Sequence, residues 1–423
     1  MKDINIYSED KVISRVLVRD GFDDLESSLA CQERVFAVVD ANVVRHCSAY
    51  RSLQSIFNSL QIPVLQIEVS EDKKDIASVM AIISFFLTSD VDRSSLVLAV
   101  GGGITTDMVG FAASIYKRGV KFAFVPTTLL AQVDAAIGGK TGVNYDGYKN
   151  MIGVIAQPYF TYICPAMLDG LSRREFLCGA AELLKTFVIE DNGNYDDAVK
   201  FLTWLYNRLS NEAFINNSYS KGRQNDLGRQ NGLVVQKGQG LQESQGVQMD
   251  QGEQDNDQGE QDCDQAQMAD QGVKIELSEN ERAMLCRLIA AAAAVKAKVV
   301  THDQFEKGER RKLNFGHTFA HAIEKCAHNA SISIMHGEAV AMGMILAARV
   351  ADKISGTALE ERFLTDFRAC GLPVECPFEI EQLAGAMLKD KKMENGILHF
   401  VIVRSIGDTA IYDISVPELI KMV

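Results

Sequence analysis

The first part of the chain alternates short apolar runs with amphipathic stretches. Four runs are rich in β-branched residues: RVFAVVD (34–40), VLQIEV (64–69), SLVLAV (95–100) and KFAFVP (121–126). Strand patterns separated by helical patterns predict βαβ units and a parallel sheet, with ligands bound at the carboxyl ends of the strands. Asp40, Gly101 and Thr127 fall at those ends.

From about Met167 the periodicity becomes helical. Long helices are predicted over ERAMLCRLIAAAAAVKAKVV (281–300) and GEAVAMGMILAARVADKI (337–354), and strand signals are few until LHFVIVRSIG near the end. We therefore predict an α/β N-terminal Rossmann-like domain with a parallel sheet over residues 1–165 and an all-α C-terminal domain over 166–423. The cleft between two such domains is the expected place for an active site.

A polar segment interrupts the second domain at about residues 216–272. Gln recurs at every third position from Gln236 to Gln254, with acidic residues between. The segment has too little apolar surface to offset the entropy of ordering, so we predict disorder. A period of three is also compatible with a partner-binding surface, but repeat expansion in a tolerant loop is the favoured interpretation.

Composition narrows the class of protein. The net charge is −13 and the pI is about 5.1, which argues against binding to nucleic acid or to an anionic membrane. Nine cysteines include no CxxC pair or finger spacing, which predicts reduced thiols. The N-terminus lacks the pattern of a signal peptide, and no apolar run reaches the length of a membrane span. A cytoplasmic enzyme fits these observations.

Two glycine-containing segments are candidates for binding anions. GGGITTD (101–107) follows a predicted strand and opens a helix, where free amides and the helix dipole favour a pyrophosphate, although a tight βα turn has the same pattern. In 126–150, Asp134, Lys140, Lys149 and Asn150 lie beside several glycines. The structural alternative there is a helix capped by Thr127 or Thr128 and followed by a solvated loop.

Histidines and a glutamate predict a metal site. NFGHTFAHAIE places His317 and His321 on one face of a helix, His336 opens the next helical stretch, and Glu182 precedes Lys185 by one turn. Two imidazoles, one carboxylate and an open position are typical of catalytic zinc. Lys185, Lys296, Arg310 and the run Asp390–Lys392 are solvated charges in the simplest interpretation. Arg310, Asn314 and two histidines within a short span favour a doubly anionic substrate.

Together these motifs resemble the 3-dehydroquinate synthase family. The family's motifs occur in order as GGGITTDMVGFAAS, YKRG, FVPTTLLAQVDAAIGGKTGVN, GYKNMIG, GAAELLKT, LNFGHTFAHAIE, HGEAVAMGM and DKK. The resemblance implies that zinc (or cobalt) is bound by Glu182, His317 and His336. It implies that NAD is bound by Asp40, Asn42, Glu71, Lys74, Gly102, Gly103, Ile104, Asp107, Thr127, Thr128 and Lys149.

The resemblance also implies a substrate and a reaction. The implied substrate is the anionic sugar phosphate 3-deoxy-D-arabino-heptulosonate 7-phosphate, contacted by Asp134, Lys140, Asn150, Lys185, Lys296, Arg310, Asn314, His321, Lys391 or Lys392, and Arg118 of the second subunit of a homodimer. The implied catalytic residues are Glu306, His321, Lys185 and Lys296, with Glu306 and His321 as acid/base candidates. Transient oxidation by NAD, β-elimination of phosphate, re-reduction and intramolecular aldol closure would give 3-dehydroquinate.

Departures from the family pattern and three alternatives remain. Gly170 and Cys178 replace larger or more polar groups, the stretch between His321 and His336 is slightly long, and the Gln-rich segment is an addition. A glycerol-dehydrogenase-like enzyme would share the fold, NAD and metal but would release NADH. Another sugar-phosphate cyclase would act on a substrate without a carboxylate. A non-catalytic scaffold would bind its partners through the Gln-rich segment.

Overall fold

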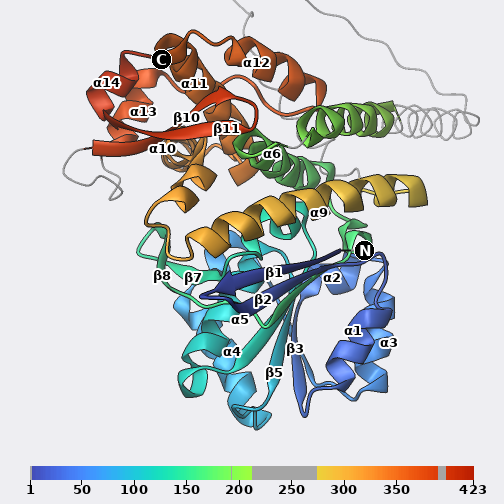
Figure 1. Ribbon diagram of the computed structural model, residues 1–423. Helices are drawn as coiled ribbons and strands as arrows, with labels where there is room; N and C mark the ends of the chain where they lie inside the picture. The colour runs from blue at the N-terminus through green and yellow to red at the C-terminus, as the bar shows by residue number, and fades with distance from the viewer. Residues whose placement is uncertain (1, 192, 212–273, 389–396) are drawn as a thin grey trace, which may run out of the picture.

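A mostly parallel sheet forms the N-terminal part of the computed structural model, which describes residues 2–191, 193–211, 274–388 and 397–423 (Figure 1). Its seven strands have the order β1-β2-β9-β6-β5-β3-β4, and only β1 and β2 pair antiparallel. The strands are β1 (Lys2–Ser8), β2 (Lys11–Val18), β3 (Val35–Asp40), β4 (Val64–Ile67), β5 (Leu96–Gly101), β6 (Lys121–Pro126) and β9 (Phe160–Ile163). The four predicted strand runs and the parallel sheet are confirmed.

The sheet is covered on both faces, which explains why its central strands are apolar throughout. Residues of β3 and β5 alternate between two clusters: Ala37 and Leu98 pack with one set of helices, whereas Val38 and Val97 pack with the other. The helices on the first face are α1 (Asp23–Ala30), α2 (Ala41–His46) and α3 (Tyr50–Ser59), and those on the second are α4 (Ile76–Thr88) and α5 (Gly103–Ile115).

The C-terminal part is helical and shares one large apolar cluster with the edge of the sheet. Its helices include α6 (Arg173–Ile189), α9 (Glu279–His302), α10 (His317–Ala330), α11 (His336–Ser355), α12 (Leu359–Ala369), α13 (Ile380–Met387) and α14 (Val416–Ile420). Helix α9 contacts β1 and α6, and it lies between the sheet and the other helices (Figure 1). One antiparallel hairpin, β10 (Ile397–Ser405) with β11 (Asp408–Ser415), accompanies the helices and includes the late strand signal.

A second hairpin brings the polar residues of 126–150 to the sheet edge. Thr128 caps the segment that follows, its hydroxyl accepting from the amide of Ala131 at 3.2 Å, and a π-helix runs over Ala131–Ala135. The chain then forms the paired strands β7 (Lys140–Tyr145) and β8 (Tyr148–Ile155), not the solvated loop of the structural alternative. A Cβ on Gly142 would lie 2.4 Å from the carbonyl oxygen of Ile152, so glycine is what lets these two strands pair closely.

The structure explains why Gly170 and Cys178 depart from the family pattern. Gly170 has φ +87° and approaches the carbonyl of His46, which a Cβ would meet at 2.1 Å, so no larger residue fits. Cys178 is buried in α6, and its sulfur accepts from the amide of Gly337 at 2.9 Å. Local packing therefore restricts which residues both positions can accept. The Gln-rich segment, and with it the predicted disorder, lies outside the described residues.

Across the described ranges, no helix combines the length and apolar character needed to traverse a bilayer.

Candidate active site

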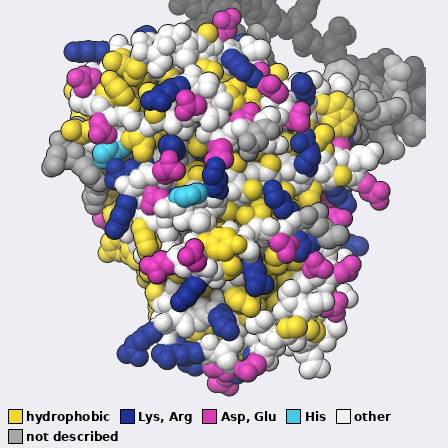
Figure 2. Space-filling view, viewed as in Figure 1, with side chains coloured by type: hydrophobic (Ala, Val, Ile, Leu, Met, Phe, Trp, Pro, Cys, Tyr) yellow, Lys and Arg dark blue, Asp and Glu magenta, His cyan; other side chains and the backbone are white. Residues whose placement is uncertain are grey.

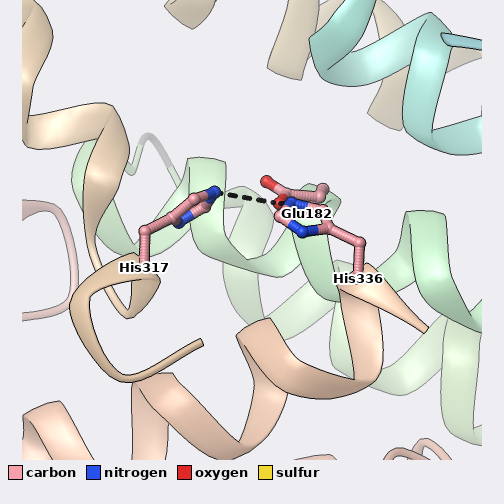
Figure 3. Close-up of side chains that lie close together, drawn as sticks. All are labelled: Glu182, His317 and His336. Atoms are coloured by element: carbon pink, nitrogen blue, oxygen red, sulfur yellow. Dashed lines mark ion pairs between the residues drawn. The ribbon is translucent and has the colours of Figure 1, made fainter. Parts of the chain in front are cut away.

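One carboxylate and two imidazoles converge where α6, α10 and α11 meet (Figure 3). Glu182 lies in α6, while His317 and His336 are the first residues of α10 and α11. The Nε2 atoms of His317 and His336 lie 3.6 and 3.3 Å from Oε1 of Glu182. One ligand atom from each residue falls within 4.8 Å of the others. The predicted convergence of these three distant residues is confirmed.

Close helix packing produces this convergence. A Cβ on Gly337 would lie 2.1 Å from the carbonyl oxygen of Cys178, so the start of α11 rests directly on α6, one turn before Glu182. Gly316 (φ +78°) precedes His317, and a Cβ added to it would lie 2.7 Å from the side chain of Met344 in α11. Glycine at these two positions lets the three helices approach until the side chains meet.

The local electrostatics suit a divalent cation. Glu182 is fully buried and pairs with Nζ of Lys185 at 2.5 Å, yet neither carboxylate oxygen has a well-directed hydrogen bond among the described residues. Burial alone would raise the pKa of Glu182, but Lys185 and the two histidines hold it well below its usual value. Burial and the charge of Lys185 lower the pKa of His317 to about 3, so this ring is neutral. Burial would lower the pKa of His336, but its hydrogen bonds to Glu182 and Glu324 raise it to about 10, so a cation bound there would take the place of a proton. One carboxylate and two imidazoles are the ligand types of an open zinc site.

Each histidine is oriented by its second nitrogen. Nδ1 of His317 lies 3.1 Å from the carbonyl oxygen of Phe315, and Nδ1 of His336 lies 3.3 Å from Oε1 of Glu324. Glu324 also accepts from Nζ of Lys149 at 2.8 Å. We did not single out Glu324 from the sequence, although His317, His321 and Glu324 follow the i, i+4, i+7 spacing of one helix face.

A group of buried charged side chains lies next to Glu182, His317 and His336. Lys296 of α9 binds Asp134 through the side chain and donates to its carbonyl oxygen at 2.5 Å. Burial would raise the pKa of Asp134, but Lys185 and Lys296 lower it to about 2. Burial lowers the pKa of Lys296 to about 8, with Lys185 and Arg310 adding to the effect and Asp134 opposing it. The predicted substrate residues Asp134, Lys185 and Lys296 therefore lie together.

The loop after α9 presents Glu306 in a strained conformation. Glu306 has φ +59°, pairs with Lys140 and accepts from Nδ2 of Asn314 at 2.6 Å. Burial would raise the pKa of Glu306, but Lys140 and these hydrogen bonds lower it. A non-glycine residue at positive φ is costly and is kept where the surrounding structure enforces it, often at functional sites.

Arg310 lies deeper than we expected for a substrate contact. The residue is 2% exposed, and its guanidinium donates to the carbonyl oxygens of Gln304 and Gly138, at 2.5 and 3.0 Å. Its Nε has no hydrogen-bond partner among the described residues. Arg310 thus joins the Glu306 loop to the segment before β7, and a Cβ on Gly138 would meet its Nη2 at 2.7 Å.

The predicted cofactor residues gather at the carboxyl edge of the sheet. Strands β3, β5 and β6 are neighbours and end at the same edge: Asp40 is the last residue of β3, and Gly102 and Thr127 directly follow β5 and β6. Gly102 caps α5, whose first residues are Gly103 and Ile104. A Cβ on Gly102 would lie 3.0 Å from the methyl group of Thr128. This edge offers the free amides of a helix N-terminus, which suit a pyrophosphate.

A polar network joins this edge to the β7–β8 hairpin. Nζ of Lys74 donates to Asp107 and to Asn150, both at 2.6 Å. The side chain of Asn144 donates to Glu71 at 2.8 Å and accepts from the amide of Asn150 at 2.9 Å. On the other side, Asp40 caps α2 by accepting from the amide of Asn42 at 2.8 Å.

The remaining predicted residues differ in position. His321 lies one turn after His317, with the ring centroids 5.5 Å apart. Arg118 follows the C-terminal end of α5, a helix about 20 Å long whose other end carries Gly103. Arg118 is therefore at the opposite edge of the sheet and is not brought to the cluster within one chain. Lys391 and Lys392 lie outside the described residues.

Two family profiles match the chain in order. Residues 64–178 match 3-dehydroquinate synthase N-terminal, and residues 263–393 match 3-dehydroquinate synthase C-terminal. A 3-dehydroquinate synthase of Picosynechococcus is 32% identical over 87% of this chain and 83% of the relative. One from Prochlorococcus marinus is 31% identical over 96% of this chain and 92% of the relative.

Solved structures share the fold. A 2-epi-5-epi-valiolone synthase from Streptomyces hygroscopicus, with NAD⁺ and Zn²⁺ bound, matches with a TM-score of 0.70 and 23% identity, covering 99% of this chain and 97% of the other. A 2-deoxy-scyllo-inosose synthase complexed with carbaglucose-6-phosphate, NAD⁺ and Co²⁺ matches with a TM-score of 0.68 and 19% identity, covering 100% and 99%. At these identities the structures establish the fold alone. The sequence profiles and the relatives establish that this chain belongs to the 3-dehydroquinate synthase family.

Proposed function

We propose that this protein is a 3-dehydroquinate synthase that converts 3-deoxy-D-arabino-heptulosonate 7-phosphate to 3-dehydroquinate and phosphate. The observation that carries the proposal is the meeting of Glu182, His317 and His336 beside buried lysines. The curated relatives bearing the name 3-dehydroquinate synthase support it. In this proposal the enzyme acts in the cytoplasm, and the chain divides near residue 165 into a cofactor-binding part and a metal- and substrate-binding part.

The residues present fit both cofactors. The three converging side chains would hold Zn²⁺ or Co²⁺, because the ring of His317 is neutral and no described residue gives the buried oxygens of Glu182 a well-directed hydrogen bond. The glycine turn at the start of α5, with Asp40, Thr127, Thr128 and the Lys74–Asp107 pair, would hold NAD. When bound, NAD takes up and returns a hydride, and the divalent ion polarises a substrate oxygen.

The lysines and Arg310 explain a preference for an anionic substrate. Lys185, Lys296 and Lys140 place three ammonium groups around Asp134 and Glu306, and Arg310 adds a buried positive charge. Such a group of cations can bind the phosphate and the carboxylate of one substrate, whereas a neutral polyol has no use for it. On the face shown in Figure 2, basic and acidic side chains are interspersed, which offers no basic tract for nucleic acid.

Glu306 and His321 are the proposed proton-transfer groups. Lys140 and Asn314 keep Glu306 ionised and fix both of its oxygens, so it can accept a proton from a substrate carbon or hydroxyl. His321 lies against the ring of His317 and can exchange a proton on the same side of the site. Lys185 and Lys296 stabilise the negative charge that such a transfer creates.

A homodimer is part of the proposal because Arg118 lies at the wrong edge to reach its own site. A second copy could supply that guanidinium to the substrate phosphate. The protein also exposes apolar side chains along one face of α4, namely Ile76, Met80 and Leu87, with exposed fractions of 38%, 52% and 59%. An exposed apolar stripe of this kind is typical of a surface covered by a partner.

The test is phosphate release from the heptulosonate phosphate with NAD present in catalytic amount. We expect many turnovers per NAD, loss of release on chelation and recovery on adding Zn²⁺ or Co²⁺. His317→Ala should remove metal binding and release together, and Glu360→Gln, a change far from the cluster, should alter neither. Absence of release with metal present would refute the proposal. Accumulation of NADH in step with product would instead indicate a dehydrogenase.

A further inference from the structure

Glu324 connects two parts of the site through a single oxygen atom. Its Oε1 lies 3.3 Å from Nδ1 of His336 and 2.8 Å from Nζ of Lys149. His336 belongs to the group of three converging side chains, whereas Lys149 lies on β8 of the β7–β8 hairpin. The two contacts come from different elements, α11 and β8, and Glu324 itself lies on α10, two turns after His317.

The side chain of Glu324 is largely buried, so its contacts with His336 and Lys149 stabilise its charge in place of water. The side chain of Glu324 is 9% exposed, so its charge depends on its two partners. Lys149 is different, because 52% of its side chain is exposed. Since an ammonium has three protons, Lys149 can hold Glu324 with one and offer the others to an anion from solvent.

We infer that Glu324 is a positioning residue that orients His336 toward the metal and Lys149 toward the anionic cofactor, and so couples the two binding sites. A carboxylate on the second nitrogen of a ligating histidine fixes its tautomer and ring orientation. A divalent cation held by His336 would make the N–H that faces Glu324 a stronger donor, which would draw Oε1 toward His336 and leave more of the Lys149 charge for an anion. The coupling is reciprocal, so the anion also tightens metal binding.

This inference rests on the proposed function only for the identity of the anion. Adenosine diphosphate ribose is the probe, because it has the pyrophosphate of NAD but lacks the nicotinamide that would face the metal. Zinc affinity is measured by competition with a chromophoric chelator, and probe affinity by calorimetry, with and without zinc. Neither measurement needs turnover.

Glu324→Gln keeps the shape of the side chain and removes its charge. We expect zinc affinity to fall about 10- to 100-fold without any probe present, as for other carboxylates behind a ligating histidine. We also expect the gain in probe affinity on adding zinc to disappear. Glu324→Asp should recover part of both effects, and Lys149→Met should lose the coupling while keeping zinc affinity close to that of the unmodified protein.

Glu360→Gln is the matched control, since it breaks another ion pair between helices, Arg349–Glu360, away from the site. It should leave zinc affinity and coupling unchanged. If Glu324→Gln binds zinc like the unmodified protein, or keeps the full coupling, Glu324 only stabilises the fold and the inference is wrong. Failure of the proposed reaction would appear instead as absent phosphate release from the unmodified protein, with these binding results unaffected.

Discussion

Replacing Glu182 by Gln separates two roles of this carboxylate, because the substitution keeps its shape while removing its charge. In the metal-free protein Glu182 pairs with Lys185, and the two side chains are 0% and 1% exposed. Loss of the pair leaves the buried Lys185 ammonium with the charge of Asp134 and, more weakly, that of Glu306. The same substitution turns the proposed metal ligand into a neutral amide.

The expected loss of stability follows from this burial. Breaking a buried ion pair by removing one partner costs about 3–5 kcal/mol, and we expect the lower end because Asp134 still neutralises Lys185 in part. Zinc adds a second difference: at a concentration a hundredfold above its dissociation constant, it stabilises a protein that binds it by about 2.7 kcal/mol. The unmodified protein should gain this increment, and Glu182→Gln should not.

Urea unfolding with chelator and with zinc measures both differences in the free energy of unfolding. Glu360→Gln provides the comparison, because its ion pair with Arg349 is partly exposed and should be worth about 0–1 kcal/mol. Equal stability of Glu182→Gln and the unmodified protein in chelator would contradict the buried-pair argument. A zinc-dependent gain retained by Glu182→Gln would show that this carboxylate is not a ligand.

Two further predictions follow from other parts of the chain. The pKa of Lys296 is lowered to about 8 from 10.5, so between these pH values the folded protein binds fewer protons than the unfolded chain, and the free energy of unfolding should rise with pH. The kcat/KM for the anionic substrate should instead fall as the pH rises through about 8, because Lys296 loses its charge. Lys296→Arg should remove that fall. Replacing residues 212–273 with a short Gly/Ser linker should leave zinc affinity and phosphate release unchanged, and loss of either on deletion would assign the segment a role in the site.

The convergence of Glu182, His317 and His336 was predictable in part because these residues lie at recognisable places in local patterns. His317 and His321 share a helix face, and His336 begins a helix, as the apolar periodicity indicated. The pairing of Glu182 with histidines more than a hundred residues away depends on packing at Gly337 and Gly316, which periodicity does not report. Residue type and motif order supplied that part of the prediction.

Three features were missed for physical reasons. The β7–β8 hairpin is rich in glycine and polar residues, so its strands lack the β-branched pattern that marked β3 and β5. Glu324 resembles any solvated helix charge until the hairpin brings Lys149 to it. The depth of Arg310 was also not foreseen, because a guanidinium bound to two carbonyl oxygens has no sequence signature distinct from one that awaits a ligand.

The place of the Gln-rich segment explains how the site can tolerate it. On the near side of the segment, Arg208 donates to the carbonyl oxygen of Glu276 at 3.0 Å and pairs with Glu281, both on the far side. Ile275 also donates to the carbonyl of Leu171 at 2.8 Å, just before α6. The two ends of the segment are thus tied together by contacts that do not involve it. Because the entropy of closing a loop grows only by about 0.6 kcal/mol for each doubling of its length, an eightfold longer connection costs about 2 kcal/mol. This entropic cost arises from closing the longer loop between its two anchored ends. The helices that bring Glu182, His317 and His336 together keep their packing.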